Sequence, residues 1–459
     1  MSPSRRIRKF LLALEITTQM QNSLMQTTTL IEPNTQQYTP DEAHAKPATP
    51  RAHCRFCATP LNHTLVDLGM SPLCESYVSR QNLNRMEPFF PLHVQVCDEC
   101  FLVQLEEYVS VEQIFSEYAY FSSYSDTWLQ HAADYVEMIV HRLGLAKGSL
   151  VVELASNDGY LLQNFVKKNI TALGVEPAAN VAKVAIEKGV PTMIKFFGRK
   201  LAQEMVADGK AADLVIGNNV LAQVPDLNDF VAGIHTLLKT GGVVTLEFPH
   251  LIKLMAENQY DTIYHEHFSY FSFITAEKIL AAHGMTVFDV EELTTHGGSI
   301  RVFARHANDT SKPVSDRVVE MRQRELHQRL DRMDTYATFG EKVKESKRNL
   351  LDFLIRARRE GKSVAGYGAP GKGNTLLNYC GIRTDFLDYT VDRNPYKQGK
   401  FLPGTHIPIF SPDRIFETKP DYLLILPWNF KQEIIRQMGR IREWGGKFVV
   451  PIPAVEVID

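Results

Sequence analysis

The sequence predicts an α/β protein with a central doubly wound sheet, a small cysteine-rich domain before it and a second α/β domain after it. Three observations lead to this class. Short apolar segments alternate with helical segments between residues 151 and 305, as in sheets whose strands are joined by helices. Two C-x-x-C pairs precede this region. A further strand, Gly-rich loop and helix follow from residue 363.

Length and composition set the number of domains. A chain of 459 residues is too long for one core, and its 44% apolar and 22% charged residues are ordinary for a globular protein. We expect a disordered leader over 1–50, a cysteine-rich domain over 51–125, the central domain over 126–308 and the C-terminal domain over 309–459. The formal net charge of −3 gives no support for nucleic acid or an anionic membrane as the main partner.

The start of the chain resembles an export signal that is not completed. Basic residues at 5–9 precede the apolar run Phe10–Leu14. Glu15 ends that run after about five residues, short of the roughly 7–15 of a secretory core. No stretch reaches the roughly 20 apolar residues of a membrane span. We therefore expect a cytoplasmic protein.

Four of the six cysteines predict a structural zinc site. They form two C-x-x-C pairs, Cys54 with Cys57 and Cys97 with Cys100, and two such pairs complete a tetrahedral set of four thiolates. Disulfides and a redox dithiol are the alternatives, but the first suits exported proteins and the second needs only one pair. Four protein ligands leave no open position for catalysis. Cys74 and Cys380 have apolar neighbours in the sequence and are expected to pack as small hydrophobic residues.

The segment Val151–Gly159, reading V-V-E-L-A-S-N-D-G, predicts a strand followed by a tight ligand-binding loop. A second strand, Thr171–Val175, ends on Glu176, where such folds hold ribose hydroxyls. A dinucleotide loop presents glycine amides to a diphosphate, and carboxylates there repel it. Because Glu153 and Asp158 flank this loop, a cationic adenosine ligand without phosphate fits better. S-adenosylmethionine is the common ligand of this kind.

Further elements continue the doubly wound pattern up to residue 305. The predicted strands are Thr192–Phe197, Ala212–Asn218, Val243–Phe248, Thr286–Val290 and Ser299–Arg305, the last two forming a hairpin, and the predicted helices are Asn180–Lys188, Phe230–Lys239 and Ile274–His283. Ligands bind outside the carboxyl ends of such strands. The predicted cofactor-binding residues share that position: Glu153, Ala155, Ser156, Asn157, Asp158, Gly159, Glu176, Pro177, Phe197, Asn218, Asn219 and Val220. Each of them alone is also compatible with an ordinary loop or helix cap.

The run Tyr264–Ser272, reading Y-H-E-H-F-S-Y-F-S, holds the candidate catalytic groups. His267 is suited to act as a general base near neutral pH, with Glu266 to tune or orient it. Tyr264 is suited to donate a hydrogen bond to a developing oxyanion. Metal binding is an alternative, although a zinc protease site needs H-E-x-x-H on a helix. A purely structural role is the other alternative.

The C-terminal domain repeats the strand–loop–helix pattern. The predicted elements are helices over 317–330 and 339–360, a strand over Ser363–Gly366 and a helix that begins near Asn374. The loop Gly366–Gly373 differs from a P-loop at Gly373, where a Mg²⁺-binding Ser or Thr would stand. Its amides and Lys372 remain able to hold a diphosphate at a helix N-terminus. The predicted substrate-binding residues here are Lys372, Asn374, Asn394, Lys397 and Trp428. The alternative is a domain that only packs against the centre.

The order of these motifs resembles the sugar C-methyltransferase family from about Cys54 to the C-terminus. The motifs are C-x2-C…C-x2-C, E-Y-A-Y-F-S-S-Y-S (117–125), E-L-A-S-N-D-G-Y-L-L (153–162), G-V-E-P (174–177), N-N-V-L-A-Q-V-P-D (218–226), Y-H-E-H-F-S-Y-F-S (264–272) and H-G-G-S-I-R (296–301). Members of that family methylate carbon 3 of nucleotide-linked 4-keto-deoxysugars with S-adenosylmethionine. The resemblance implies a class I methyltransferase-type, Rossmann-like central sheet and a nucleotide-sugar-binding C-terminal domain.

The resemblance also implies roles for single residues. His267 is implied as the base, Glu266 and Tyr264 as its assistants, and Tyr120 as a further residue that reaches the sugar. Gln223 departs from the family, which commonly has a histidine there. A glutamine binds substrate by hydrogen bonds but does not shuttle protons, so we expect Gln223 to be substrate-binding.

Three functions compete at this point. The first is C-methylation of a nucleotide-linked keto-deoxysugar, with thymidine diphosphate as the expected nucleotide, by a monomer or weak homo-oligomer. The second keeps S-adenosylmethionine but moves the methyl group to an oxygen or nitrogen of another small molecule. The third is a zinc-anchored nucleic-acid-binding protein with an inert methyltransferase-like body, which the missing basic excess disfavours.

Overall fold

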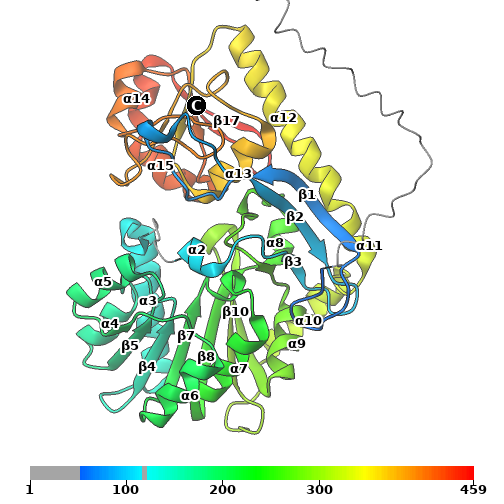
Figure 1. The fold of residues 1–459 in the computed structure, drawn as a ribbon, viewed down its shortest axis with the longest axis vertical. Helices are drawn as coiled ribbons and strands as arrows, with labels where there is room; N and C mark the ends of the chain where they lie inside the picture. Colours follow the sequence, from blue (N-terminus) through cyan, green and yellow to red (C-terminus); the bar gives the residue numbers. More distant parts are fainter. Residues whose placement is uncertain (1–51, 116–120) are drawn as a thin grey trace, which may run out of the picture. The chain divides into compact units, whose positions relative to one another are not determined.

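A computed structural model of the protein describes residues 52–115 and 121–459. Strands in this part of the chain form three sheets, which Figure 1 shows as an N-terminal, a central and a C-terminal sheet. Across these described ranges, no helix has the length and apolar character needed to cross a membrane.

The central sheet has the strand order β10-β11-β8-β7-β4-β5-β6 within the described residues. Its strands are β4 (Leu150–Leu154), β5 (Thr171–Val175), β6 (Thr192–Met193), β7 (Ala212–Asn218), β8 (Leu238–Pro249), β10 (Met285–Leu293) and β11 (Ser299–His306). Neighbours from β6 to β8 are parallel, whereas β11 lies antiparallel between β8 and β10. The predicted doubly wound sheet is confirmed, including the hairpin of its last two strands.

Helices cover both faces of the central sheet (Figure 1). They are α3 (Asp126–Leu143), α4 (Leu162–Lys167), α5 (Ala179–Glu187), α6 (Arg199–Ala207), α7 (Leu227–Leu237) and α9 (Phe273–Ala282). The short helix α8 (Leu251–Ala256) instead packs in the core that the N-terminal and C-terminal sheets share. Apolar side chains of α3, α4 and α5 share one core with the sheet, and those of α6, α7 and α9 share another. Because the helices cover the two faces of the sheet, a binding site is expected among the loops at the carboxyl ends of the parallel strands.

Several predicted elements of the central domain differ in extent. The strand expected over Val243–Phe248 begins at Leu238, and the strand expected over Thr286–Val290 continues to Leu293. The expected strand Thr192–Phe197 stops after Met193, and Phe196 beyond it is 41% exposed. The expected helix Phe230–Lys239 is α7, which begins earlier because the Asp226 side chain accepts a hydrogen bond from the Asp229 amide. That side-chain cap satisfies an amide that has no partner within the helix.

The N-terminal sheet is built from two distant parts of the chain. It has the order β1-β2-β3-β9 in the described residues, with β1 (His63–Ser71), β2 (Phe90–Val96), β3 (Val103–Leu105) and β9 (Ser269–Tyr270). The short elements η1 (Arg80–Asn82), α2 (Val111–Phe115) and η2 (Ser122–Tyr124) connect it onward. Since β9 follows β8 in the chain and pairs antiparallel with β3, the N-terminal sheet holds part of the predicted catalytic run.

The C-terminal sheet has the order β14-β13-β12-β15-β16-β17 within the same ranges. Its strands and helices are α10 (Asp316–His327), α11 (Met333–Ala337), α12 (Phe339–Arg359), β12 (Val364–Tyr367), α13 (Gly371–Cys380), β13 (Thr390–Val391), β14 (Ile409–Phe410), α14 (Asp413–Thr418), β15 (Tyr422–Ile425), α15 (Lys431–Gln437), β16 (Lys447–Val450) and β17 (Glu456–Ile458). The helix expected to begin near Asn374 begins at Gly371 instead, so Lys372 lies in its first turn.

One hydrophobic core joins the N-terminal and C-terminal sheets. Along α12 the residues Phe339, Val343, Leu350 and Leu354 are buried at successive spacings of four, seven and four, which gives one apolar stripe. This stripe packs against β1, and Figure 1 shows the long helix beside that strand. The two outer domains are therefore packed on each other as well as on the central domain.

Candidate active site

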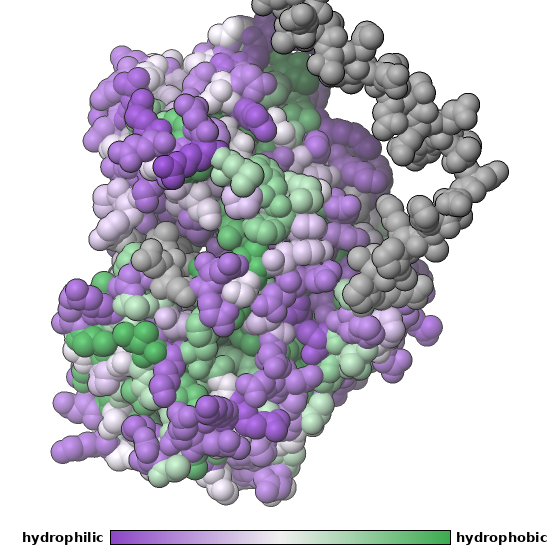
Figure 2. Space-filling model, viewed as in Figure 1, coloured by the Kyte–Doolittle hydropathy of each residue, from purple (hydrophilic) through white to green (hydrophobic). Residues whose placement is uncertain are grey.

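A cavity of about 530 Å³ lies where the three domains meet. The space-filling view shows a mostly hydrophilic face on which hydrophobic residues gather mainly down the middle (Figure 2). Most predicted site residues line the cavity: Ala155, Asn157, Glu176, Pro177, Phe197, Asn218, Asn219, Val220, Gln223, Tyr264, Glu266, His267, Lys372, Asn394 and Lys397. The structure therefore brings residues of the central and C-terminal domains together around one space.

The loop after β4 has the backbone of a tight ligand-binding turn. Ala155, Asn157 and Gly159 have φ angles of 56°, 49° and 75°, in the left-handed region. Glu176 fastens this loop to the end of β5, because its Oε2 accepts from the Asn157 amide and its Oε1 from the Ala178 amide, each at 2.9 Å. The carboxylate at the end of β5 is thus fixed at the cavity wall.

Four predicted loop residues lie behind the cavity wall. Glu153, Ser156, Asp158 and Gly159 do not line the cavity. Asp158 pairs with Lys188 Nζ at 3.1 Å. Burial raises the pKa of Glu153 well above its ordinary value, and the charges of Glu176 and Asp158 raise it further. The loop therefore carries less negative charge than its carboxylates alone indicate.

The four predicted zinc ligands fit a single metal ion. The Sγ atoms of Cys54, Cys57, Cys97 and Cys100 all lie within 4.8 Å of one another. Two Sγ pairs, Cys54 with Cys100 and Cys57 with Cys97, are 3.5 Å apart. Four thiolates at about 2.3 Å from one zinc ion lie roughly 3.8 Å from each other, so the cluster matches a closed tetrahedral site.

The zinc cluster also fastens the N-terminal domain to the central domain. Arg55, between the first two cysteines, donates from Nη1 to the Pro225 carbonyl at 3.0 Å. Asn228 on α7 donates from Nδ2 to the Phe56 carbonyl at 2.9 Å. Since Pro225 lines the cavity, the metal cluster supports the wall that also contains Gln223.

His267 is held as a neutral imidazole in the cavity. Its Nδ1 lies 3.0 Å from the Thr262 carbonyl oxygen. Because a carbonyl only accepts, Nδ1 carries the proton and Nε2 is left to accept one. Burial lowers the pKa of His267 to about 4, although the Thr262 hydrogen bond raises it and the Lys372 charge lowers it. The ring centroid of Tyr264 is 4.1 Å away.

Glu266 faces a cysteine of the N-terminal domain. The Cys74 thiol donates to Glu266 Oε1 at 3.4 Å. Burial raises the pKa of Cys74, and the neighbouring carboxylates Glu266 and Glu75 raise it further. The expectation of apolar packing is therefore wrong for Cys74, which has a polar partner at the cavity. Cys380 is buried, with its Sγ 3.7 Å from the Tyr260 hydroxyl.

Of the two predicted catalytic tyrosines, Tyr264 lies within the described residues and Tyr120 does not. Burial raises the pKa of Tyr264 well above its ordinary value, so its hydroxyl keeps its proton and remains a donor. Tyr120 lies outside the described residues, and its role stays a prediction.

Two predicted substrate residues lie behind the wall formed by the C-terminal domain. Asn374 and Trp428 do not line the cavity. Asn374 Nδ2 donates to the Cys74 carbonyl at 2.6 Å, and Trp428 Nε1 donates to Asp261 Oδ2 at 2.6 Å. In this arrangement both side chains tie the C-terminal domain to the rest of the site.

His296 is a cavity residue that the sequence analysis did not select. Its φ of 53° places it in the left-handed region, directly before Gly297 and Gly298. The His296 Nε2 lies 2.7 Å from Asn219 Nδ2, and its ring meets Trp128 edge-on at 5.0 Å. Burial lowers its pKa to about 3. The H-G-G motif was the available signal, since strained backbone concentrates at functional sites.

Family models match three successive parts of the chain. A zinc binding domain matches residues 54–115, a methyltransferase domain matches 128–290, and a C-methyltransferase C-terminal domain matches 294–453. These descriptions agree with the cysteine cluster, the doubly wound sheet and the second α/β domain.

A known relative extends this agreement over nearly the whole chain. The C-methyltransferase NovU of Streptomyces niveus is 37% identical over 410 residues, which are 89% of this chain and 97% of that protein. Among solved structures, an S-adenosylmethionine-dependent methyltransferase from Clostridium acetobutylicum has 14% identity and a TM-score of 0.33, covering 39% of this chain and 92% of that one. Magnesium protoporphyrin IX methyltransferase from Synechocystis has 18% identity and a TM-score of 0.32, covering 38% and 82%. The chain therefore belongs to the S-adenosylmethionine-dependent C-methyltransferases that combine a zinc-binding, a methyltransferase and a C-methyltransferase C-terminal domain.

Proposed function

We propose that this C-methyltransferase acts on the carbon next to the keto group of a nucleotide-linked deoxysugar, after removing a proton from that carbon to give an enolate. The single observation that carries the proposal is His267, a buried neutral imidazole in the cavity whose Nδ1 is bound to Thr262. Methyl transfer to a carbon of low acidity requires a base that removes a proton from that carbon. A neighbouring carbonyl makes this proton removal feasible, because it stabilises the enolate that forms.

The side chains of the catalytic run divide the proton transfer between them. His267 Nε2 accepts the proton, since Nδ1 already donates to the Thr262 carbonyl. Tyr264 keeps its own proton and donates a hydrogen bond to the keto oxygen. Glu266, held by Cys74, gives the site a fixed carboxylate next to the base.

The loop residues of the central domain hold the methyl donor in this proposal. When bound, S-adenosylmethionine supplies an electrophilic methyl group on a sulfonium sulfur. Glu176 binds the ribose hydroxyls, and Asn218 binds a polar group of the ligand. Both amide atoms of Asn218 are buried and have no hydrogen-bond partner among the described residues, as expected of a side chain that awaits a ligand.

The C-terminal domain supplies the binding site for the nucleotide part. Lys397 and Asn394 line the cavity on this side, and Lys397 Nζ donates to the Ala369 carbonyl at 2.9 Å. A diphosphate between sugar and nucleoside suits a lysine and backbone amides. Gln223 contacts the sugar by hydrogen bonds. We keep thymidine diphosphate as the expected nucleotide, in a cytoplasmic enzyme that is a monomer or weak homo-oligomer.

Proton exchange without the methyl donor tests the proposal. The protein is incubated in D₂O with a thymidine diphosphate-linked 4-keto-deoxysugar, and NMR follows the hydrogens next to the keto group. We expect the signal at carbon 3 to disappear with wild type and to persist with His267→Ala. The control His141→Ala changes an exposed histidine on α3 and should exchange like wild type.

Two further readings decide the outcome. His267→Ala should bind S-adenosylhomocysteine within about threefold of wild type, because the residue lies in the catalytic run and not in the loop after β4. If wild type binds the sugar nucleotide and no exchange occurs, the enolate route is wrong. Methyl transfer to an oxygen or nitrogen of another small molecule would then be the better function.

A further inference from the structure

A buried lysine of the C-terminal domain lines the same cavity as the base. Burial lowers the pKa of this lysine, Lys372, whereas the charge of the nearby Asp261 raises it. Lys372 lies in the first turn of α13 and lines the cavity. Its Nζ donates to Asn429 Oδ1 at 2.8 Å and stands 4.7 Å from the centre of the Trp428 ring. Among the ion pairs of the described residues none includes Lys372, whereas Lys397 on the same wall pairs with Glu75 at 3.5 Å. Lys372 therefore has hydrogen-bond donors left for an anion in the cavity.

The structure fixes Lys372 relative to the catalytic base through a single turn. Trp428, beneath the ammonium, donates to Asp261 Oδ2 at 2.6 Å. The next residue, Thr262, holds His267 Nδ1 through its carbonyl. Lys372, through Trp428, and His267 are thus linked to Asp261 and Thr262, which are successive residues of η4 (Tyr260–Thr262).

A second contact fixes the position of α13 relative to η4. Thr375, on the same helix as Lys372, donates from Oγ1 to the Ile263 carbonyl at 2.8 Å. Asn374 beside it donates to the Cys74 carbonyl. The first turns of α13 are therefore anchored to both the central and the N-terminal domain, and these contacts position Lys372.

The charge of Lys372 reaches the two imidazoles of the cavity. Burial is the main cause of the low pKa of His267 and of His296, and the charge of Lys372 lowers both further. A cation near a base makes that base weaker, which by itself opposes proton removal. The arrangement is useful only if the same cation stabilises the charge that the proton removal creates.

We infer that Lys372 is a catalytic residue whose ammonium stabilises the oxygen of the enolate, an inference that rests on the proposed function. In this step the C–H bond next to the keto group breaks and its proton moves to His267 Nε2. The C–H electron pair forms the C=C bond, and the carbonyl π pair moves to the oxygen. Lys372 stays protonated and donates a hydrogen bond to that oxygen. The charges of the enolate and the new imidazolium balance each other.

This role differs from the diphosphate contact expected from the Gly-rich loop. A lysine that binds a diphosphate contributes equally to the bound substrate and to the transition state, so its loss weakens binding. A lysine on the enolate oxygen contributes when the negative charge develops, so its loss slows proton removal at saturating substrate. The two roles therefore predict different measurements for the same variant.

Lys372→Met is the variant that separates them. We measure the exchange rate at carbon 3 in D₂O without methyl donor, at saturating sugar nucleotide, and the Kd of thymidine diphosphate by calorimetry. We expect exchange to fall roughly 10²–10³-fold, as when an oxyanion donor is removed, with the Kd of thymidine diphosphate within about threefold of wild type. Lys372→Gln, which keeps a neutral donor, should exchange faster than Lys372→Met and slower than wild type.

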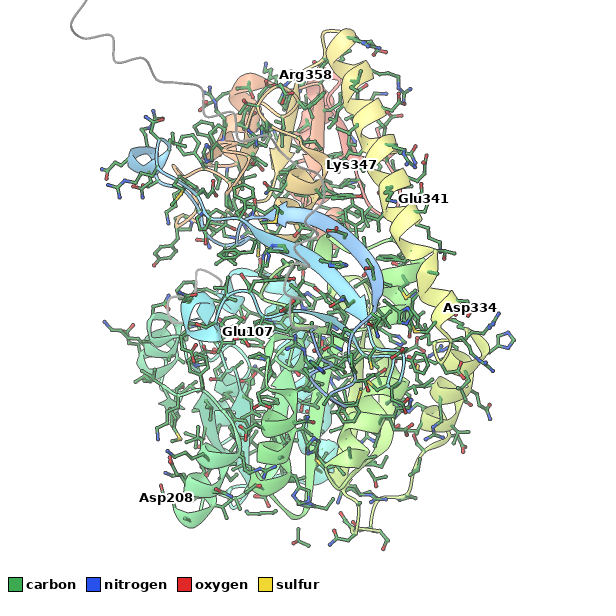
Figure 3. The ribbon with its side chains drawn as sticks, turned by 45° about the vertical axis from the view of Figure 1, so that its right-hand side comes forward. Glu107, Asp208, Asp334, Glu341, Lys347 and Arg358 are labelled. Atoms are coloured by element: carbon green, nitrogen blue, oxygen red, sulfur yellow. The ribbon has the colours of Figure 1, made fainter. Side chains whose placement is uncertain are left out.

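Lys347→Met is the matched control. Lys347, labelled in Figure 3, lies on α12, stands 4.6 Å from the Tyr379 ring and donates to the Tyr379 carbonyl at 2.6 Å. It is a lysine on an aromatic ring in the same domain but does not line the cavity. Exchange and nucleotide affinity should both match wild type.

Each other outcome overturns the inference in its own way. Unchanged exchange in Lys372→Met means that the ammonium does not touch the enolate. A tenfold or larger rise in the Kd of thymidine diphosphate with exchange retained assigns Lys372 to the diphosphate. If Lys372→Met does not fold, as judged by S-adenosylhomocysteine binding, Lys372→Gln decides by the same two readings. Absent exchange in wild type removes the proposed function itself, and this inference with it.

Discussion

At the scale of single residues, the protonation state of His267 has a direct kinetic consequence. The imidazole must be neutral to accept a proton, and its pKa is lowered to about 4. The fraction of neutral His267 therefore stays near one as the pH falls from 7 to 5, and decreases only as the pH approaches 4. An unperturbed histidine would lose half of its neutral form at about pH 6.5.

The first prediction follows from this shift. The exchange rate at saturating sugar nucleotide should have no acid limb with a midpoint near 6.5, and the limb due to His267 should appear below pH 5. NMR exchange rates between pH 4.5 and 8 test it, with circular dichroism at each pH to confirm that the fold is intact. A midpoint between 6 and 7 would show that another group, or a differently placed histidine, controls the step.

Gly159 allows a second prediction about the loop after β4. Its φ is +75°, and an added Cβ would lie 3.0 Å from Val190 Cγ2. Gly189 is the matched control, because its φ of +83° is similar but an added Cβ would have nothing within 4 Å. Gly189→Ala should cost only the left-handed backbone strain, about 1–2 kcal/mol.

Gly159→Ala should cost this strain and the crowding against Val190, about 1–3 kcal/mol more. Urea unfolding of both variants measures the difference in the free energy of unfolding. Gly159→Ala should also weaken S-adenosylhomocysteine binding, since Asn157 of the same loop is hydrogen-bonded to Glu176 at the end of β5. Equal stabilities of the two variants would mean that the loop moves away from Val190 without cost.

At the scale of elements, the two cysteine pairs act as a fastener between the N-terminal domain and α7. Binding free energy of a structural zinc ion is folding free energy, roughly 10 kcal/mol in small zinc-dependent peptides. We predict that removing the metal with a strong chelator lowers the thermal midpoint by at least about 10 °C, and that Cys57→Ser does the same.

The element-scale prediction has a specific readout beyond stability. Because Arg55 and Asn228 connect the cluster to the cavity wall near Pro225, loss of metal should reduce sugar-nucleotide exchange more than S-adenosylhomocysteine affinity. Scanning calorimetry, metal analysis and the two ligand assays measure this. A chelated protein with unchanged midpoint and exchange would refute a structural metal.

At the scale of the whole molecule, two ligands should bind one cavity from different domains. We predict that S-adenosylhomocysteine and thymidine diphosphate each raise the thermal midpoint, with about 2.7 kcal/mol of stabilisation at 100 times Kd. Their effects should add when both are present, since they contact different walls. A thermal-shift titration tests it, and a shift by polynucleotide without one by thymidine diphosphate would favour the nucleic-acid function.

The features of this molecule that its sequence predicts are those encoded by short motifs. The central sheet, the zinc cluster and the positions of Ala155, Asn157 and Asn218 on the cavity wall follow from residues that are close in the chain. His296 depends instead on Asn219, 77 residues away. The pairing of β9 with β3 likewise joins segments that no local pattern connects. Trp428 shows a third difficulty, because its indole points to Asp261 rather than into the cavity.

The turn Tyr260–Ile263 has a consequence for anyone who recombines these enzymes. It belongs to the central part of the chain, yet its contacts with Trp428 and Thr375 come from the C-terminal domain. An exchange of residues 294–453 between relatives would transfer the expected nucleotide preference. It would also replace Trp428 and Thr375, whose contacts with the turn hold the catalytic base His267 in place. Chimeras that carry the donor's own turn should stay active, whereas junctions that separate turn and domain should yield folded proteins that bind both ligands and turn over slowly.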